Sequence, residues 1–165
     1  MQVWAIDASS IIDLRQIPGK QDGSREAVFA ALTTLVEQGR LFFPPQVFDE
    51  VLRFGATVAQ EWAKANEVKA TKYKPAYADI KPVLDKIPRL IDPSKPAGTD
   101  QADPYVIVTA QRLAADGHTP TIITEDRKKQ QGKIPLSSAA GVFGFPSVAL
   151  YVFLETEGIT GSMAP

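Results

Sequence analysis

Short apolar runs of strand type alternate with longer segments of helical periodicity along this chain. Residues 3–6 and 121–124 are compact runs of apolar or β-branched residues, whereas residues 25–38 carry apolar side chains at helical spacing. Continuous apolar strands are typical of parallel sheets that helices cover on both faces. The alternation therefore predicts an α/β fold with a central, mostly parallel sheet.

Prolines, capping residues and shorter apolar runs predict where the remaining helices, strands and loops lie. Pro45 fits the first turn of a helix, Pro75 and Pro82 are expected to break the helix-prone stretch 56–87, and Thr99 or Asp100 fits the cap of a helix near residue 103. The expected further strands are 41–43 and 142–147, the expected closing helix is 148–157, and residues 130–141 are expected to form a loop.

The length favours one domain over residues 1–165, since single cores usually form at roughly 100 to 200 residues. The most basic stretch is 56–87, and its lysines favour a solvated helical face over an RNA groove, because lysines cover most helix surfaces. Trp62 and Tyr105 are expected to pack in the interior rather than stack on bases.

The amino-acid composition limits which metal ligands and which partners the chain can use. The chain has no cysteine and one histidine, so any metal must be held by oxygen ligands. The formal net charge is −1, so nucleic-acid binding would need a local basic patch. No basic segment with a long apolar run opens the chain, which favours a cytoplasmic protein without membrane attachment.

Acidic residues stand where functional groups gather in parallel sheets. Asp7 and Asp126 follow two of the expected strands, while Glu50 and Asp103 lie in the first turns of two helices. Crowded carboxylates repel one another unless a cation neutralises them, so the pattern predicts a site for Mg²⁺ or Mn²⁺ and phosphodiester hydrolysis.

Local alternatives remain at each position. Taken singly, Asp7 also fits a helix cap and Glu50 a surface residue. Glu125 competes with Asp126, and Asp100 competes with Asp103, because a helix that starts one residue away would turn either acid to the rim.

Four stretches in this order resemble the PIN-domain family of nucleases, which includes the toxin ribonucleases of bacterial toxin–antitoxin pairs. The stretches are Val3-Trp4-Ala5-Ile6-Asp7-Ala8-Ser9-Ser10-Ile11-Ile12-Asp13-Leu14, Pro45-Gln46-Val47-Phe48-Asp49-Glu50-Val51, Ala102-Asp103-Pro104-Tyr105-Val106-Ile107 and Thr121-Ile122-Ile123-Thr124-Glu125-Asp126.

The resemblance implies a PIN-like three-layer α/β/α sandwich and a metal-dependent endoribonuclease. It makes Asp7, Glu50, Asp103 and Asp126 the metal ligands and catalytic acids, with Ser9 as the helper beside the first acid and Ser10 as a substitute. It further implies an RNA substrate, an antitoxin protein as partner and a homodimer. The helical, lysine-containing insertion around 56–90 and the segment Lys133-Ile134-Pro135 resemble a less-studied bacterial and archaeal branch.

Basic residues directly follow the fourth acid. Arg127, Lys128 and Lys129 are candidate RNA contacts, since Arg and Lys neutralise backbone phosphates, and a solvated loop explains them equally well.

Other functions fit the pattern less completely. The near-neutral charge favours, as the alternative, a non-catalytic RNA-binding or assembly module on a PIN scaffold. A phosphatase with Asp7 as nucleophile lacks a second Asp two residues on, where Ser9 stands. A dinucleotide-binding domain lacks a glycine-rich turn after the first strand.

Overall fold

The centre of the fold is a four-stranded, all-parallel sheet. The computed structural model describes residues 1–14, 22–95 and 101–159. Its strands are β1 (Gln2–Ile6), β2 (Leu41–Phe42), β3 (Thr119–Ile123) and β4 (Ser147–Val148), in the order β2-β1-β3-β4. The longest pairing joins β1 to β3 and runs from Gln2 opposite Thr119 to Ile6 opposite Ile123.

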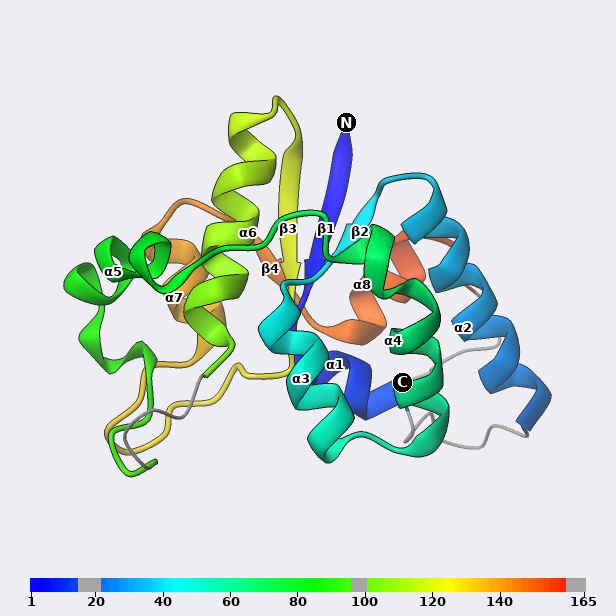
Figure 1. Cartoon of the computed structure of the whole chain (residues 1–165), viewed down its shortest axis with the longest axis horizontal. Helices are drawn as coiled ribbons and strands as arrows, with labels where there is room; N and C mark the ends of the chain where they lie inside the picture. Colours follow the sequence, from blue (N-terminus) through cyan, green and yellow to red (C-terminus); the bar gives the residue numbers. More distant parts are fainter. Residues whose placement is uncertain (15–21, 96–100, 160–165) are drawn as a thin grey trace.

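Helices cover both faces of the sheet. In Figure 1, α5, α6 and α7 lie on one side of the strands and α2 and α4 on the other, while α3 lies beyond the tips of the strands. The three-layer α/β/α architecture with a parallel sheet is therefore confirmed. The helices are α1 (Ala8–Asp13), α2 (Asp22–Glu37), α3 (Pro45–Phe54), α4 (Thr57–Ala70), α5 (Tyr77–Lys86), α6 (Asp103–Ala115), α7 (Leu136–Val142) and α8 (Leu150–Thr156), with a short 3₁₀ turn η2 (Pro88–Leu90).

The strand order creates a switch point between β1 and β3. From β1 the chain first adds β2 on one side, and later adds β3 on the other. In open α/β sheets, a crevice opens at the carboxyl ends of the two strands where the order reverses, and ligands bind there. The residues that follow Ile6 and Ile123 therefore border the expected site.

The strands and α6 form the middle of the core. Val3, Ile6, Ile122 and Ile123 are completely buried, as expected for strands covered on both faces. Tyr105 of α6 is buried as well. Trp62 of α4 packs against the rings of Phe29 and Phe43. The packing role predicted for Trp62 and Tyr105 is therefore confirmed.

Pro82 does not break its helix, contrary to the prediction, whereas Pro75 does lie between α4 and α5. Pro82 stands inside α5, where it cannot donate a backbone hydrogen bond. The Asp79 carboxylate accepts from the backbone N–H of Ala76 and closes the first turn, and Ile80 and Val83 are buried where α5 contacts α6. Packing and capping thus outweigh the cost of the proline.

Two predictions near the carboxyl end were wrong. Part of the expected loop 130–141 is the helix α7, because Leu136, Ala139 and Ala140 present a buried helical face. The expected strand 142–147 is reduced to β4, since Val142 still belongs to α7 and Gly144, with a φ of +83°, lies in the turn that ends this helix, so that pairing begins only at Ser147.

The cap predicted at Thr99 or Asp100 lies outside the described residues; α6 begins at Asp103 after Ala102. No helix in the described part of the chain is both long enough and apolar enough to cross a membrane.

Candidate functional site

Asp7 lies at the carboxyl end of β1 and caps α1. Its backbone N–H bonds to the carbonyl of Ile123, which fixes the residue at the switch point. One carboxylate oxygen accepts from the backbone N–H of Ser10 at 3.2 Å and from Ser9 Oγ at 2.6 Å. Asp7 is 3 % exposed. The cap interpretation is thus correct, and the same carboxylate also faces the crevice.

Hydroxyl groups join Asp7 to the end of β3. Thr124 Oγ1 donates to the second carboxylate oxygen of Asp7 at 2.6 Å and accepts from the backbone N–H of Asp126 at 2.9 Å. Ser9 Oγ accepts from the backbone N–H of Glu125 at 3.1 Å. Ser9 and Thr124 therefore orient Asp7 relative to the turn that carries Asp126.

Glu50 connects α3 to the start of α6. One of its carboxylate oxygens accepts from the backbone N–H of Ala102 at 3.1 Å, and this bond satisfies a free donor at the beginning of the helix. The helix that begins next presents Asp103 in its first turn. Glu50 is therefore held at the crevice instead of standing free on the surface.

Lys133 links the other two acids. Its Nζ donates to Asp103 Oδ2 and to Asp126 Oδ2, both at 2.9 Å. The side chains of the three residues are 14 to 19 % exposed. Asp126 Oδ2 also accepts from the backbone N–H of Leu136 at 3.0 Å, so it is tied to the start of α7.

These side chains line one pocket of about 250 Å³, which we call the acid pocket. The predicted acids come from four separate parts of the sequence and meet here, together with Ser9. The lining residues are Asp7, Ser9, Glu50, Asp92, Lys95, Gln101, Ala102, Asp103, Asp126, Gln130 and Lys133.

The pocket disfavours the charged state of Asp7, Asp103 and Glu50. Burial, and then the neighbouring Asp103, raises the pKa of Asp7 to about 7 despite three hydrogen bonds. Burial raises the pKa of Asp103 to about 6; Lys133 opposes this shift, and Asp126 and Glu50 add to it. Burial also raises the pKa of Glu50. Burial, the largest cause of all three shifts, thus leaves the charged forms of these acids less well stabilised than in water.

The competing acid Glu125 turns away from the pocket. Its Oε1 accepts from the backbone N–H of Leu150 at 2.5 Å, so it caps α8. Asp126, not Glu125, therefore lines the crevice. Asp100, the competitor of Asp103, lies outside the described residues.

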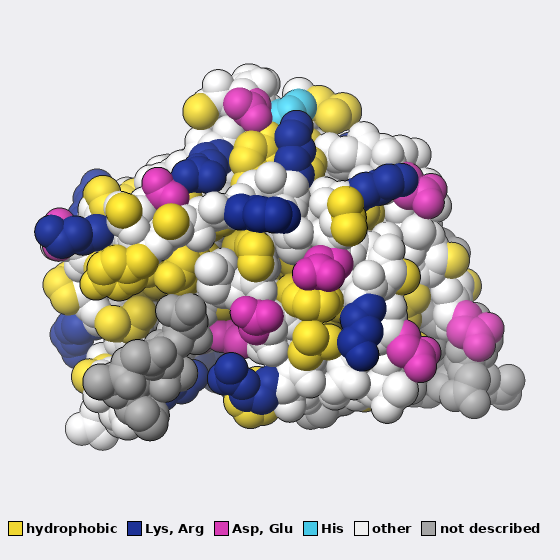
Figure 2. All heavy atoms as spheres, viewed as in Figure 1, with side chains coloured by type: hydrophobic (Ala, Val, Ile, Leu, Met, Phe, Trp, Pro, Cys, Tyr) yellow, Lys and Arg dark blue, Asp and Glu magenta, His cyan; other side chains and the backbone are white. Residues whose placement is uncertain are grey.

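The candidate RNA contacts lie outside the pocket lining. Arg127, Lys128 and Lys129 are exposed, and Arg127 Nη1 donates to Ser147 Oγ. The lysines of the insertion, Lys64, Lys69, Lys72, Lys74, Lys81 and Lys86, are exposed too. On the face drawn in Figure 2, basic and acidic side chains are interspersed, as the solvated-face interpretation expects.

The donor chemistry suits a divalent metal, but the present spacing does not. Carboxylate oxygens are the ligands that Mg²⁺ and Mn²⁺ prefer. Within residues 1–14, 22–95 and 101–159, however, no group of three or more His, Cys, Asp or Glu side chains is arranged to hold an ion. The ammonium group of Lys133 lies between two of the acids. The metal site stays a prediction.

Sequence reasoning missed two side chains that bond to the predicted acids, those of Lys133 and Thr124. Lys133 stood out only as part of a segment after Asp126, and Thr124 only as the end of a strand. For Thr124, a hydroxyl residue two positions before an acid at a strand end was the available clue. For Lys133, Gly132 was a weaker clue, since a glycine with a φ of +80° makes the tight turn that returns the chain to the crevice.

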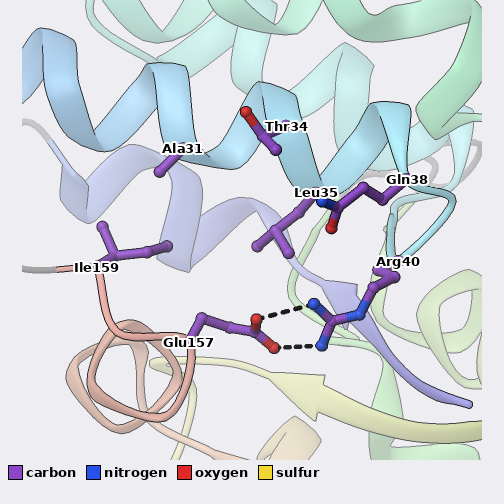
Figure 3. Close-up of a pocket in the computed structure, with 7 residues that line it drawn as sticks. All are labelled: Ala31, Thr34, Leu35, Gln38, Arg40, Glu157 and Ile159. Carbon is purple, nitrogen blue, oxygen red and sulfur yellow. Dashed lines mark hydrogen bonds and ion pairs between the residues drawn. The ribbon is translucent and has the colours of Figure 1, made fainter.

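A second pocket, of about 330 Å³, lies between α2 and the end of α8 (Figure 3). Here Arg40 Nη1 and Nη2 donate to the two carboxylate oxygens of Glu157 at 2.9 and 2.6 Å. Trp4 Nε1 also donates to Glu157, at 2.7 Å. We call this the Arg40–Glu157 pair; it ties the turn after α8 to the sheet.

Residues 4–161 match a family described as "Domain of unknown function (DUF4411)", and the chain belongs to this family. No curated protein and no solved structure matches the chain.

Proposed function

We propose that this protein is a divalent-metal-dependent nuclease that hydrolyses RNA phosphodiesters. The observation that supports it most is the convergence of Asp7, Glu50, Asp103 and Asp126 at the switch point of a parallel sheet. The raised pKa values of Asp7 and Asp103 add that the pocket is short of positive charge, which a divalent cation supplies.

Under this proposal each residue has a defined task. Asp7, Glu50, Asp103 and Asp126 hold the cation; when bound, Mg²⁺ or Mn²⁺ supplies charge neutralisation at the scissile phosphate and lowers the pKa of a bound water. Ser9 and Thr124 keep the Asp7 carboxylate turned toward the pocket through their hydrogen bonds.

Conservative replacement of the acids tests the proposal. Asp7→Asn and Asp103→Asn are expected to lower cleavage of a labelled single-stranded RNA in Mn²⁺ by about a thousandfold or more, since each removes a charged metal ligand. Melting temperatures measured in parallel show whether the variants fold.

Glu125→Gln is the matched control. It removes an acid next to Asp126 in the sequence that points to α8 instead of the pocket, and its amide oxygen can still accept from Leu150. Activity within about twofold of the wild type is expected. Equal activity in the wild type and in both asparagine variants would overturn the nuclease proposal.

The choice of RNA and of partners rests on the resemblance to PIN-domain nucleases. We include in the proposal an antitoxin protein that restrains the activity, and a homodimer. Cleavage of an RNA and of a DNA with the same base order distinguishes the substrates, and light scattering on the purified protein measures its mass in solution.

A specific observation favours a second candidate, a non-catalytic RNA-binding or assembly module. Lys133 already supplies a positive charge to Asp103 and Asp126, as in a pocket that functions without metal. Calorimetric titration with Mn²⁺ separates the two candidates, because the module predicts no binding even at millimolar concentration.

A further inference from the structure

Lys133 occupies a central place in the acid pocket. Its Nζ is 2.9 Å from Asp103 Oδ2 and 2.9 Å from Asp126 Oδ2. These acids come from the start of α6 and from the turn after β3, two elements that approach only in the folded protein. The ammonium group therefore bridges the two carboxylates as a cation would.

The backbone around Lys133 holds this bridge in place. The Lys133 N–H bonds to the carbonyl of Gln130, and Gly132 takes the positive φ that the tight turn needs. On the other side, the Ile134 N–H bonds to the carbonyl of Arg89 at 2.8 Å, which fastens the segment to η2. The reach of Lys133 into the pocket thus follows from two backbone anchors.

We propose that Lys133 is the resident counterion of the acid pocket, and that a divalent cation binds by displacing its ammonium group from Asp103 and Asp126. This inference rests on the proposed function and adds a residue to it. Lys133 is a positioning residue that keeps the two carboxylates apart and neutralised until the metal arrives, and it sets the metal concentration that the site requires.

The bond lengths show why a magnesium ion and the Lys133 ammonium group cannot bind between Asp103 and Asp126 at the same time. Mg²⁺ binds oxygen at about 2.1 Å, while the ammonium nitrogen lies 2.9 Å from each carboxylate oxygen. The carboxylates must therefore close in before they can share a metal ion. An ammonium group left between them would block that movement and repel the ion in a partly buried pocket.

Among the described residues, no group of three or more His, Cys, Asp or Glu side chains is placed to hold an ion, and two of the pocket's acids are bonded to the ammonium group instead. Removal of Lys133 would let them approach an ion, and it would leave the metal-free pocket with uncompensated charge.

Calorimetric titration of Mn²⁺ into the full chain at neutral pH tests the inference. Lys133→Met removes the charge while keeping much of the side-chain volume, and it is expected to lower the Kd for Mn²⁺ by about tenfold. Lys133→Gln, which keeps one amide donor, serves if the first variant fails to fold. Lys133→Arg keeps the charge and is expected to bind Mn²⁺ no more tightly than the wild type.

Lys95→Met is the matched control. Lys95 lines the same pocket and lowers the pKa of Glu50 through space, whereas Lys133 bonds directly to two acids. Removing Lys95 changes the net charge equally, so its effect on the Kd is expected to stay below about threefold. The difference in Kd for Mn²⁺ between Lys133→Met and Lys95→Met therefore measures the effect of displacing the Lys133 ammonium group, apart from the change in net charge.

Melting temperatures provide a readout that a merely structural lysine would not change in the same way. Without metal, Lys133→Met is expected to melt below the wild type, and saturating Mn²⁺ is expected to raise its melting temperature more than that of the wild type. A structural role would lower both values together.

The outcomes separate the two proposals. If Mn²⁺ binds the wild type, is lost in Asp103→Asn, and binds Lys133→Met and Lys133→Gln no more tightly, the displacement is wrong and the nuclease proposal stands. If Mn²⁺ binds none of the proteins at millimolar concentration, the metal site fails and the inference fails with it.

Discussion

The acid pocket and the Arg40–Glu157 pair solve the same electrostatic problem in different ways. In the pair, one guanidinium group meets one carboxylate through two hydrogen bonds, and Trp4 adds a third. In the acid pocket, five acids from separate segments share the lining with two lysines, and Lys133 bonds to only two of the acids, Asp103 and Asp126. The first arrangement is balanced, and the second has an excess of negative charge.

The difference indicates what each region does. A balanced, well-bonded ion pair contributes to holding the end of α8 on the sheet. An excess of buried carboxylates is costly to the fold, and such an excess is consistent with the cation site proposed above. Removing the charge of an acid should therefore lower the free energy of unfolding at the Arg40–Glu157 pair and raise it in the acid pocket.

The largest effect on stability is expected from pH. Asp7 ionises near its ordinary pKa of 3.8 when unfolded but near 7 when folded, so between these values the folded state holds more protons. The free energy of unfolding of the metal-free protein is therefore expected to fall as pH rises from about 4 to 7, by on the order of 3 kcal/mol. Denaturant titrations in a chelator measure it.

Asp103 and Glu50 shift in the same direction and add to this slope. The pKa of Lys133 is raised from 10.5, so its favourable contribution is constant over this range. Asp7→Asn is the control, and it is expected to make the curve shallower and to leave the smaller slope due to Asp103 and Glu50. A stability that increased over these pH values would contradict the excess-charge description of the pocket.

Glu157→Gln is expected to destabilise the protein by about 2 kcal/mol, because Arg40 is left partly buried without its charge partner. The affinity for Mn²⁺ should stay unchanged, since the pair lies outside the acid pocket. Denaturation and calorimetry on the same preparation measure both. A loss of metal binding in this variant would mean that the two regions are coupled.

Thr124→Val removes one hydroxyl that serves two acids. It is expected to cost about 1 to 2 kcal/mol of stability and to reduce cleavage about tenfold, as Asp7 loses a donor and the Asp126 N–H loses its acceptor. Thr109→Val, which removes a buried hydroxyl that bonds to the Tyr105 carbonyl within α6, is the control. Equal losses of activity in both would argue against the link to Asp7.

The smallest effect is expected from the exposed basic residues. Replacing Lys128 and Lys129 with Ala should change stability by less than about 0.5 kcal/mol. It should weaken RNA binding by about threefold, and this difference should vanish in high salt because phosphate contacts are screened. Binding titrations at two salt concentrations measure it. A loss as large as that in Asp103→Asn would place these lysines in the pocket chemistry.

The sequence was sufficient for the fold class and for the convergence of the four acids, because both depend on local patterns. Apolar runs identify strands buried on both faces, and an acid after a parallel strand must lie at one edge of the sheet. The positions of Asp7 and Asp126 at the same edge of the sheet follow directly from that rule.

The remaining parts depend on contacts between distant residues. Lys133 reaches the pocket because Ile134 is anchored to Arg89 across the fold, and no periodicity records such a contact. Pro82 remains helical because α5 packs on α6, which outweighs its local preference. The choice between Glu125 and Asp126 was decided by the position of α8, which the sequence places only within a few residues.

The pairing of β1 with β3 has a consequence for how the protein is made. More than a hundred residues separate Gln2–Ile6 from Thr119–Ile123. The ribosome must therefore synthesise most of the chain before β3, the partner of β1, is available for pairing. Until then the apolar strand β1 lacks its partner on one edge, and an unpaired apolar strand edge is prone to aggregate. Asp7 and Asp126 also stay apart until late, so a half-made chain cannot assemble the pocket.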